Sequence, residues 1–257
     1  RAKLLDSRHP KPTSGSRLGD AGERAELPTG EGRVLPGFGS GIGERHELEA
    51  PSLGTWYNFY VFKIGNAHSR QVAVIFEDVT VRKRREANLA FLTEIQDEFT
   101  HLVSADEIMQ AVGEKIGAYL NISQCVFGEI DRSQDRVTIE YDWHNLELPD
   151  LIGVYQLSDF VSEEFLQAAQ TGETIVINNT QADARTDADR YAAFNIHAFA
   201  IVPFHRGNEW KYLLTINDSR AREWREDEIE LISELANLIF PRLERARAEA
   251  VVAANLR

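Results

Sequence analysis

The fold of this chain is decided by the run AFAIVPFHRGNEWKYLLTINDS, residues 198–219, and by REWREDEIELISELANLI, residues 222–239, which follows it. The first run predicts two core strands joined at Arg206-Gly207-Asn208, because a short polar turn separates two segments rich in β-branched and aromatic residues. The second run predicts a helix, since its apolar residues recur every three or four positions. Together they indicate a strand hairpin that leads into a long terminal helix.

Shorter strands and helices alternate upstream of this hairpin. Ser104 and Glu107 form a capping-box pattern, which predicts the start of a helix. The apolar face of that helix consists of Ile108, Val112, Ile116 and Leu120. Capping residues and polar turns delimit the remaining elements: strands over 124–131 and 136–143, a helix from Ser162 to Gly172, a strand over 174–178, a polar loop over 179–189 and a helical turn ending near Ile196.

Long helical patterns lead into and out of this block. The first runs from Asp78 to Phe99, with Thr80 as its capping residue, and the last runs from Asp227 to Arg257. Pro241 lies inside the last pattern and predicts a kink or a break there.

Both helices carry apolar faces that predict self-association. On the first, the spacings of 3, 4 and 3 are typical of a coiled-coil seam. Its residues are Leu92, Ile95, Phe99 and Leu102, and those of the last helix are Ile232, Leu235, Ile239 and Leu243. Because these faces exceed what one small domain would bury, we expect a parallel homodimer through the flanking helices.

The N-terminal part of the chain has a different composition. Residues 1–43 are rich in glycine, proline, serine and charge, so they cannot bury enough apolar surface to offset their ordering entropy and are expected to be linker or disordered. From Glu44 three strand-like runs follow, ERHELEA, TWYNFYVFKI and RQVAVIFEDV. They predict half of an antiparallel meander, which is too short for an independent domain.

The block from about Glu94 to Ala246 resembles a GAF domain in its order of helix, strand pair, helix, strand, loop, hairpin and helix. The resemblance implies an α+β fold with an antiparallel sheet flanked by helices. In many GAF domains the last strand ends in Asn-Lys, with Phe and Asp-Glu downstream. The matching positions here are Asn217, Asp218, Trp224, Asp227 and Glu228. Asp218 replaces the lysine, so the lysine–aspartate bridge of that pattern cannot form.

The segment from Gly54 to Leu89 resembles the last strands of a PAS domain and its Asp-Val-Thr exit into a signalling helix. A PAS–GAF string is similar to the sensory half of bacterial histidine kinases. The resemblance implies linker over 1–43, partial PAS-like strands over 44–80, a connecting signalling helix over 81–103, a GAF domain over 104–246 and a helical extension over 247–257.

The GAF resemblance also implies a ligand pocket between the sheet and the helices on one face. The positions that would line it are Phe127, Tyr155, Phe160, Phe165, Arg185, Tyr191, Phe194, His197 and Phe199. Aromatic walls with a few polar groups suit small ligands, and the same side chains equally suit an ordinary core. Arg185, the one cation beside Asp183, Asp187 and Asp189, is expected to meet an anionic or carbonyl group of the ligand.

Other chemistry has weaker signals. Cys125 alternates with Phe127 on a predicted strand, which favours packing over redox chemistry or ligand attachment. Bilin-binding relatives of GAF domains attach the pigment through a cysteine in the helix before the hairpin, and residues 185–196 contain none, so no covalent bilin is expected. His197 and His205 share a strand face without a third metal ligand. His101 does not resemble the phosphoacceptor motif of histidine kinases.

The composition narrows the function further. The 257 residues suffice for about two domains, and 41 acidic against 28 basic residues give a net charge of −13. Such a surface repels nucleic-acid phosphates and anionic lipid. No stretch approaches the ~20 apolar residues of a membrane span, the N-terminal segment lacks a signal-peptide core, and a single cysteine fits a reducing, cytoplasmic compartment.

We therefore expect a sensory and dimerising module, without a kinase catalytic core of its own, that binds an unidentified small molecule. A ligand-free structural spacer and a small-molecule enzyme are the alternatives.

Overall fold

The computed structural model of the chain describes residues 2–6, 44–50, 54–64, 71–145 and 148–255. The chain divides into two compact units, Arg1–Glu86 and Ala87–Arg257, and each contains one antiparallel sheet. Within the described ranges, no helix is long and apolar enough to cross a membrane.

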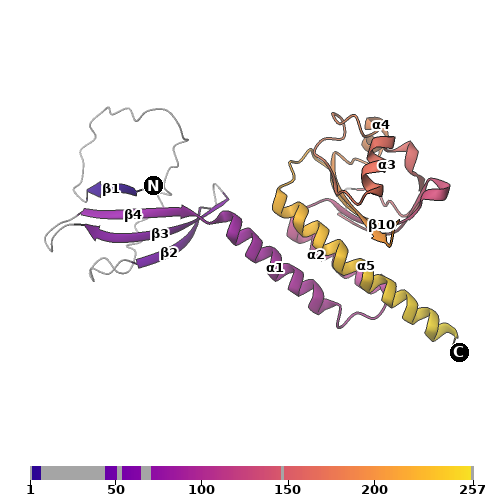
Figure 1. Cartoon of the computed structure of the whole chain (residues 1–257), viewed down its shortest axis with the longest axis horizontal. Coiled ribbons are helices and arrows are strands. Elements are labelled where there is room, and N and C mark those ends of the chain that lie inside the picture. Colours follow the sequence, from indigo (N-terminus) through magenta and orange to yellow (C-terminus); the bar gives the residue numbers. More distant parts are fainter. Residues whose placement is uncertain (1, 7–43, 51–53, 65–70, 146–147, 256–257) are drawn as a thin grey trace. The chain divides into compact units, whose positions relative to one another are not determined.

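The first unit is a four-stranded sheet in the order β1-β4-β3-β2 (Figure 1). All three strands predicted from Glu44 onward are present: β2 (Glu44–Ala50), β3 (Thr55–Ile64) and β4 (Gln71–Asp78). Each pairs with its sequence neighbour, so the meander follows the chain.

A fourth strand corrects the prediction for the N-terminus. Residues Ala2–Asp6 form β1 rather than linker, and they pair antiparallel with β4 from Ala2 opposite Ile75 to Asp6 opposite Gln71. The physical reason is that β4 has a second edge whose backbone groups need partners. The sequence carries this signal as the apolar pair Leu4-Leu5. Residues 7–43, the rest of the predicted linker, lie outside the described residues.

Helix α1 (Thr80–Glu98) begins directly after β4. The Asp78 carboxylate accepts a hydrogen bond from the Thr80 amide at 2.9 Å. The Thr80 hydroxyl, predicted to cap the helix, instead accepts from the Trp56 amide at 2.8 Å, and the Val79 amide donates to the Trp56 carbonyl at 2.8 Å. The start of α1 is thus fixed to β3 by the hydrogen bonds of Val79 and Thr80 with Trp56.

The second unit is a six-stranded antiparallel sheet in the order β7-β6-β5-β10-β9-β8. Its strands are β5 (Gln124–Asp131), β6 (Arg136–His144), β7 (Gly153–Gln156), β8 (Ile175–Ile177), β9 (Ala198–Arg206) and β10 (Glu209–Asp218). The predicted β9–β10 hairpin is present. The edge strand β7 was not predicted, because four half-exposed residues give too short an alternation to recognise.

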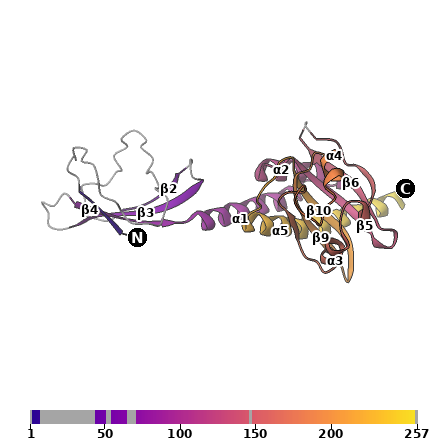
Figure 2. The same ribbon diagram turned by 90° about the horizontal axis from the view of Figure 1, so that it is seen from above.

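Helices cover both faces of this sheet. Helices α2 (Ala105–Leu120) and α5 (Glu226–Asn255) pack on one face, together with the second half of α1. The shorter α3 (Glu163–Gln170) and α4 (Ala188–Ala193), with the 3-10 turn η2 (Leu157–Asp159), cover the other. In Figure 2 the strands of the sheet lie between α2 and α3. Ser104 caps α2 in the predicted capping box, and Ser162 caps α3.

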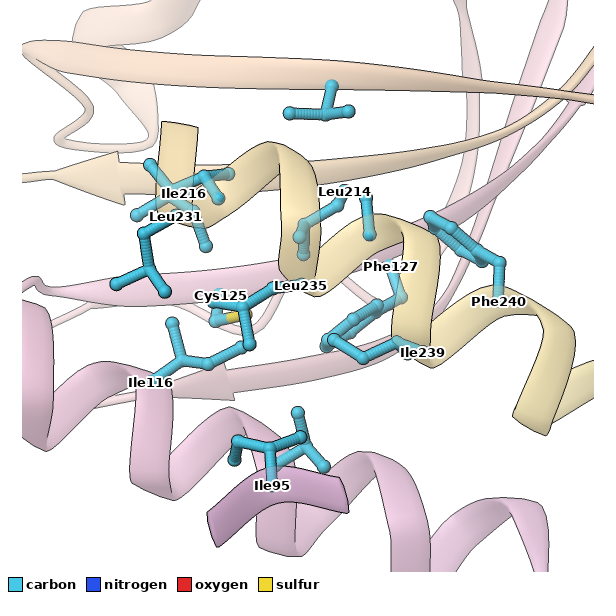
Figure 3. Close-up of a cluster of buried hydrophobic side chains, with 14 of the residues drawn as sticks. Ile95, Ile116, Cys125, Phe127, Leu214, Ile216, Leu231, Leu235, Ile239 and Phe240 are labelled. Carbon is cyan, nitrogen blue, oxygen red and sulfur yellow. The ribbon is translucent and has the colours of Figure 1, made fainter. Parts of the chain in front are cut away.

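The larger core lies between the sheet and the long helices. Figure 3 shows side chains from α1, α2, α5 and the central strands converging there, among them Ile95, Ile116, Cys125, Phe127, Leu214, Leu235 and Phe240. The predicted apolar face of α2 is fully or almost fully buried in this core.

The residues predicted to form the dimer seam belong to this same core. Ile95 is fully buried, and Leu92, Phe99 and Leu102 pack against the cluster within one chain. The predicted apolar face of α5 is equally buried. The premise that these faces exceed the needs of one domain was therefore wrong, because α1, α2 and α5 satisfy each other on a single sheet face.

Pro241 does not end α5, which continues to Asn255. Proline removes one backbone hydrogen bond from a helix. The neighbouring Ile239, Phe240 and Leu243 are buried in the core, and this packing holds the helix across the missing bond.

Candidate functional site

Six of the predicted pocket residues form one aromatic layer on the face covered by α3 and α4. Its members are Tyr155, Phe160, Phe165, Tyr191, Phe194 and Phe199. Tyr191 stacks on Phe199 with ring centroids 5.0 Å apart. Phe160 meets Tyr155 at 5.8 Å, and Tyr191 and Phe194 at 6.0 Å each. The rings of β7, η2, α3, α4 and β9 therefore form a continuous apolar surface.

Burial divides this layer into an inner and an outer part. Phe165, Tyr191 and Phe199 are buried, and burial raises the pKa of the Tyr191 hydroxyl well above its usual range. Phe160 and Phe194 remain half-buried, as does Tyr155. The inner rings serve as core, whereas the outer rings keep part of their apolar surface exposed.

Phe127 does not belong to this layer. It projects from β5 to the opposite face, where its ring meets Phe240 of α5 at 6.3 Å. Side chains alternate along a strand, so Val126 takes the aromatic side. Cys125 shares the face of Phe127 and is fully buried; burial, with a smaller effect of the Asp142 charge, raises the pKa of its thiol. Both residues are core on the α2/α5 side.

Arg185 is held within its own loop. Its guanidinium donates to both oxygens of Asp183, at 3.0 and 2.8 Å, and to the Val176 carbonyl of β8 at 3.1 Å. The Arg185 hydrogen bonds keep the pKa of the Asp183 carboxyl below its usual value. Asp187 caps α4 by accepting from the Arg190 amide. The cation predicted to meet a ligand thus already has a carboxylate partner, which fixes the loop on the edge strand.

His197 directly precedes β9, two residues before Phe199. Its amide donates to the Asp218 carbonyl at 2.9 Å, and its carbonyl accepts from the Thr180 amide at 2.8 Å. In the parts of the chain that the structure describes, no three His, Cys, Asp or Glu side chains are grouped to hold a metal ion.

A row of polar side chains crosses the sheet on the aromatic side. Gln124 of β5 donates to the Asp142 carboxylate of β6 at 2.9 Å and accepts from the Asn217 amide of β10 at 2.9 Å. Gln124 and Asn217 are almost fully buried. Asp142 and Gln124 were not among the predicted site residues, although a polar residue inside an otherwise apolar strand was a signal for them.

Arg222 was also missed, and it joins the end of β10 to two helices. Its guanidinium donates to Asp218 at 3.3 Å and to Glu228 of α5 at 2.7 Å. It also donates to the carbonyls of Leu120 and Asn121, at the C-terminal end of α2, at 3.0 and 3.3 Å. A cation suits that helix end. Asp218 is therefore paired with an arginine four residues later in the chain.

Trp224 extends this contact to the edge strand β8. The Arg222 guanidinium lies over its ring at 4.6 Å. The indole N–H donates to the Ile177 carbonyl at 3.3 Å, and the Arg222 amide donates to the Asn178 carbonyl at 3.0 Å. We call Asp218, Arg222, Trp224 and Glu228 the arginine junction. It connects α2 and α5 to β8, the strand that leads into residues 179–189, which we call the Arg185 loop.

A family model described as "GAF domain" matches residues 103–240, which is more than half of the chain. The chain belongs to the GAF family. The matched residues contain the whole six-stranded sheet and the arginine junction of this GAF domain.

Solved structures share this fold at low sequence identity. The phycoerythrobilin-bound GAF domain from a cyanobacterial phytochrome is 14% identical with a TM-score of 0.53, covering 63% of this chain and 97% of that one. The free methionine-R-sulfoxide reductase from Neisseria meningitidis, in complex with its substrate, is 14% identical with a TM-score of 0.53, covering 65% and 93%. The GAF domain from Acinetobacter phosphoenolpyruvate-protein phosphotransferase is 17% identical with a TM-score of 0.51, covering 64% and 97%. No curated protein matches the chain.

Proposed function

We propose that this GAF domain is the sensory module of a bacterial signal-transduction protein, a sensor histidine kinase, and that it binds a small molecule on the α3/α4 face. GAF domains are sensory or regulatory modules of signalling proteins. Two of the similar structures hold a bilin or a substrate, which supports a binding role here. The module itself contributes no catalysis, and without a cysteine in residues 185–196 it takes no covalent bilin there.

The observation that carries this proposal is the physical route from the aromatic face to the long helices. The Arg185 loop is bonded to Val176 of β8, and β8 is bonded through Ile177 to Trp224 of the arginine junction. The junction holds the C-terminal end of α2 and the start of α5. A ligand that prefers one arrangement of the loop would therefore bias the packing of both helices.

The first unit supports the signalling context. Its meander passes into α1 through Asp78-Val79-Thr80, and this turn is hydrogen-bonded to Trp56. Such a fixed start suits a helix that transmits movement, in agreement with the PAS-like resemblance.

A dimer would complete the relay. Because the predicted seam is buried, it would use apolar residues that are exposed instead, such as Leu89 of α1, which is 65% exposed. Light scattering of Leu89→Lys beside the wild-type chain tests this contact.

Ligand binding is tested in two steps. Thermal-shift screening of a metabolite library, with native mass spectrometry of the purified chain, identifies compounds that bind. Hydrogen exchange with a confirmed compound should then show slower exchange in residues 180–197 and also near Leu120 and Arg222. Protection of the loop without any change at the junction would reject the relay.

The competing function is a ligand-free spacer. The mutual packing of the aromatic rings favours it, since these rings are core without a ligand. A library screen without hits, together with unchanged signalling after Phe160→Ala and Phe194→Ala, would establish the spacer. Impaired signalling in these two variants, with unchanged unfolding temperature, would support the sensor.

A further inference from the structure

Two buried oxygen atoms on the aromatic side of the sheet have no hydrogen-bond partner among the described residues. They are Oδ1 of Asp142 and Oδ1 of Asn217. A buried polar atom without a partner is costly, and in a folded protein it calls for an explanation such as a bound water or ligand. Both atoms are hydrogen-bond acceptors, so whatever satisfies them must be a donor.

The directions of the hydrogen bonds among Asp142, Gln124 and Asn217 leave these two oxygens without a donor. Gln124 uses its amino group toward the Asp142 carboxylate at 2.9 Å and the Pro149 carbonyl at 3.2 Å. The side-chain oxygen of Gln124 therefore needs a donor, and the side-chain amino group of Asn217 donates to it at 2.9 Å. Rotating the Asn217 amide would place two oxygens against each other. The second Asp142 oxygen is already occupied, since it also accepts from the Leu151 amide at 2.6 Å.

The charges around Asp142 favour a cation. The groups that act on its carboxyl are the Asp150 carboxylate and His144, which lies two residues further along β6. The Tyr155 hydroxyl and the Cys125 thiol feel its charge in turn. Asp142 and Asp150 are two acids against one histidine, so the local field is negative when both are ionised.

The row borders the aromatic layer at both ends. Asn217 of β10 lies opposite Phe199 of β9 in the strand register, and Phe199 stacks on Tyr191. At the other end Asp142 of β6 lies opposite Val126 of β5 in the strand register, and Val126 belongs to the core cluster that contains the aromatic layer. A ligand whose donors reach the row would therefore place its remaining body against aromatic rings.

We propose that the free oxygen of Asp142 forms the polar end of a binding site for an organic ammonium or amidinium ion with an aromatic body. That oxygen receives an N–H group of the ion, and the aromatic layer receives its ring. Hydrogen bonds from a cation to a carboxylate are about twice as strong as neutral ones, and cations are attracted to aromatic faces. This inference rests on the proposed ligand-binding function and specifies its ligand class.

The test compares three ligands of the same shape by calorimetry: benzamidinium, which is cationic with N–H donors, benzamide, which is neutral, and benzoate, which is anionic without them. We expect benzamidinium to bind most tightly. Asp142→Asn should weaken benzamidinium about tenfold or more while changing benzamide less than about threefold. Asp189→Asn, which removes an exposed charge of α4, is the matched control and should change neither. The unfolding temperature of each variant shows that it is folded.

A second measurement uses only the unmodified chain. Binding a cation requires an ionised Asp142, and burial raises the pKa of this carboxyl. The affinity for benzamidinium should therefore rise with pH through that pKa, whereas the affinity for benzamide should stay constant. His144 is the other side of the charge balance around this carboxyl, so the pH series is repeated with His144→Gln, in which the rise should persist.

Several results would overturn the inference. Tightest binding of benzamide or benzoate would do so, as would an Asp142→Asn variant that binds benzamidinium like the unmodified chain. A crystal structure grown with benzamidinium that shows only an ordered water on the free Asp142 oxygen would do the same. If Phe160→Ala and Phe194→Ala also left the binding of every compound found by the library screen unchanged, the proposed function of the α3/α4 face would fail as well. Weaker binding in Phe160→Ala and Phe194→Ala, together with a preference of the unmodified chain for anionic compounds, would reject only the ligand class.

Discussion

Replacing Arg222 with methionine tests whether the arginine junction stabilises the domain. Methionine keeps the length and apolar stem of the side chain and removes the guanidinium. Four hydrogen bonds are lost, two to carboxylates and two to the last carbonyls of α2. The Asp218 and Glu228 side chains are only 3% and 4% exposed, so their charges cannot recover full hydration.

The cost follows from this burial. Breaking a buried ion pair by removing one partner costs about 3–5 kcal/mol, because the other charge stays buried. Two features place Arg222→Met at the low end. The Arg222 side chain is itself 17% exposed, and Glu228 keeps a second partner, since the Arg225 guanidinium lies 3.0 Å away. We expect a loss of about 3 kcal/mol, which for a domain of this size corresponds to about 6–12 °C in unfolding temperature.

Urea unfolding followed by circular dichroism measures this loss. Arg245→Met is the matched control, because Arg245 is 73% exposed and forms a single surface pair with Glu249. Such pairs contribute less than about 0.5 kcal/mol. Adding Asp218→Asn to Arg222→Met should recover part of the loss, since the Asp218 carboxylate, whose one remaining ion pair among the described residues is at 3.5 Å to the exposed Arg220, is then neutral. A loss for Arg222→Met no larger than for Arg245→Met would refute this account of the junction.

Three further predictions concern the two faces of the sheet. In Gly117→Ala the new methyl group would overlap the Trp143 indole that packs on α2. Overpacking costs about 1–3 kcal/mol against a gain of about 1 kcal/mol in helix propensity, so thermal unfolding should show a net loss of up to about 2 kcal/mol. Burial raises the pKa of the Cys125 thiol, so a thiol reagent should label the native chain only as fast as the domain opens, and labelling without urea as fast as in urea would contradict this. Burial also raises the pKa of Asp142, so its contribution to stability is greatest below the unfolded pKa, near 4, and is lost as pH rises through the folded pKa. Urea unfolding at several pH values should therefore show the free energy of unfolding of Asp142→Asn rising relative to that of the unmodified chain across that window. Parallel pH profiles of the two chains would count against it.

The sequence predicted the elements of the second unit better than their partners. Apolar runs and capping residues placed both hairpins and α2, because burial and caps act locally. The seam on α1 shows the limit of the same reasoning. A spacing of three and four residues is equally suited to a second chain and to the core of one domain. Ile95 and Phe99 carry no feature that distinguishes the two.

The candidate site was predicted in part for a related reason. Alternation along β5 shows that Phe127 and Val126 face opposite ways, but it does not show which face carries α3 and α4. The aromatic layer was recognised because aromatic residues are conspicuous in a sequence. Gln124 and Arg222 were not, since their roles depend on partners 93 and 102 residues away, and such distant pairings appear only in the folded chain.

The energy of the arginine junction also fits a relay. If one arrangement of the helices keeps the Arg222 bridge and another breaks it, a difference of about 3 kcal/mol leaves the second arrangement below about 1% of the population. A ligand that binds the second arrangement about 100-fold more tightly would then populate both comparably. A single small molecule on the aromatic face can supply such a preference, because about 2.7 kcal/mol corresponds to only a few good contacts. A much stronger bridge would lock the helices, and a much weaker one would leave both arrangements populated without ligand.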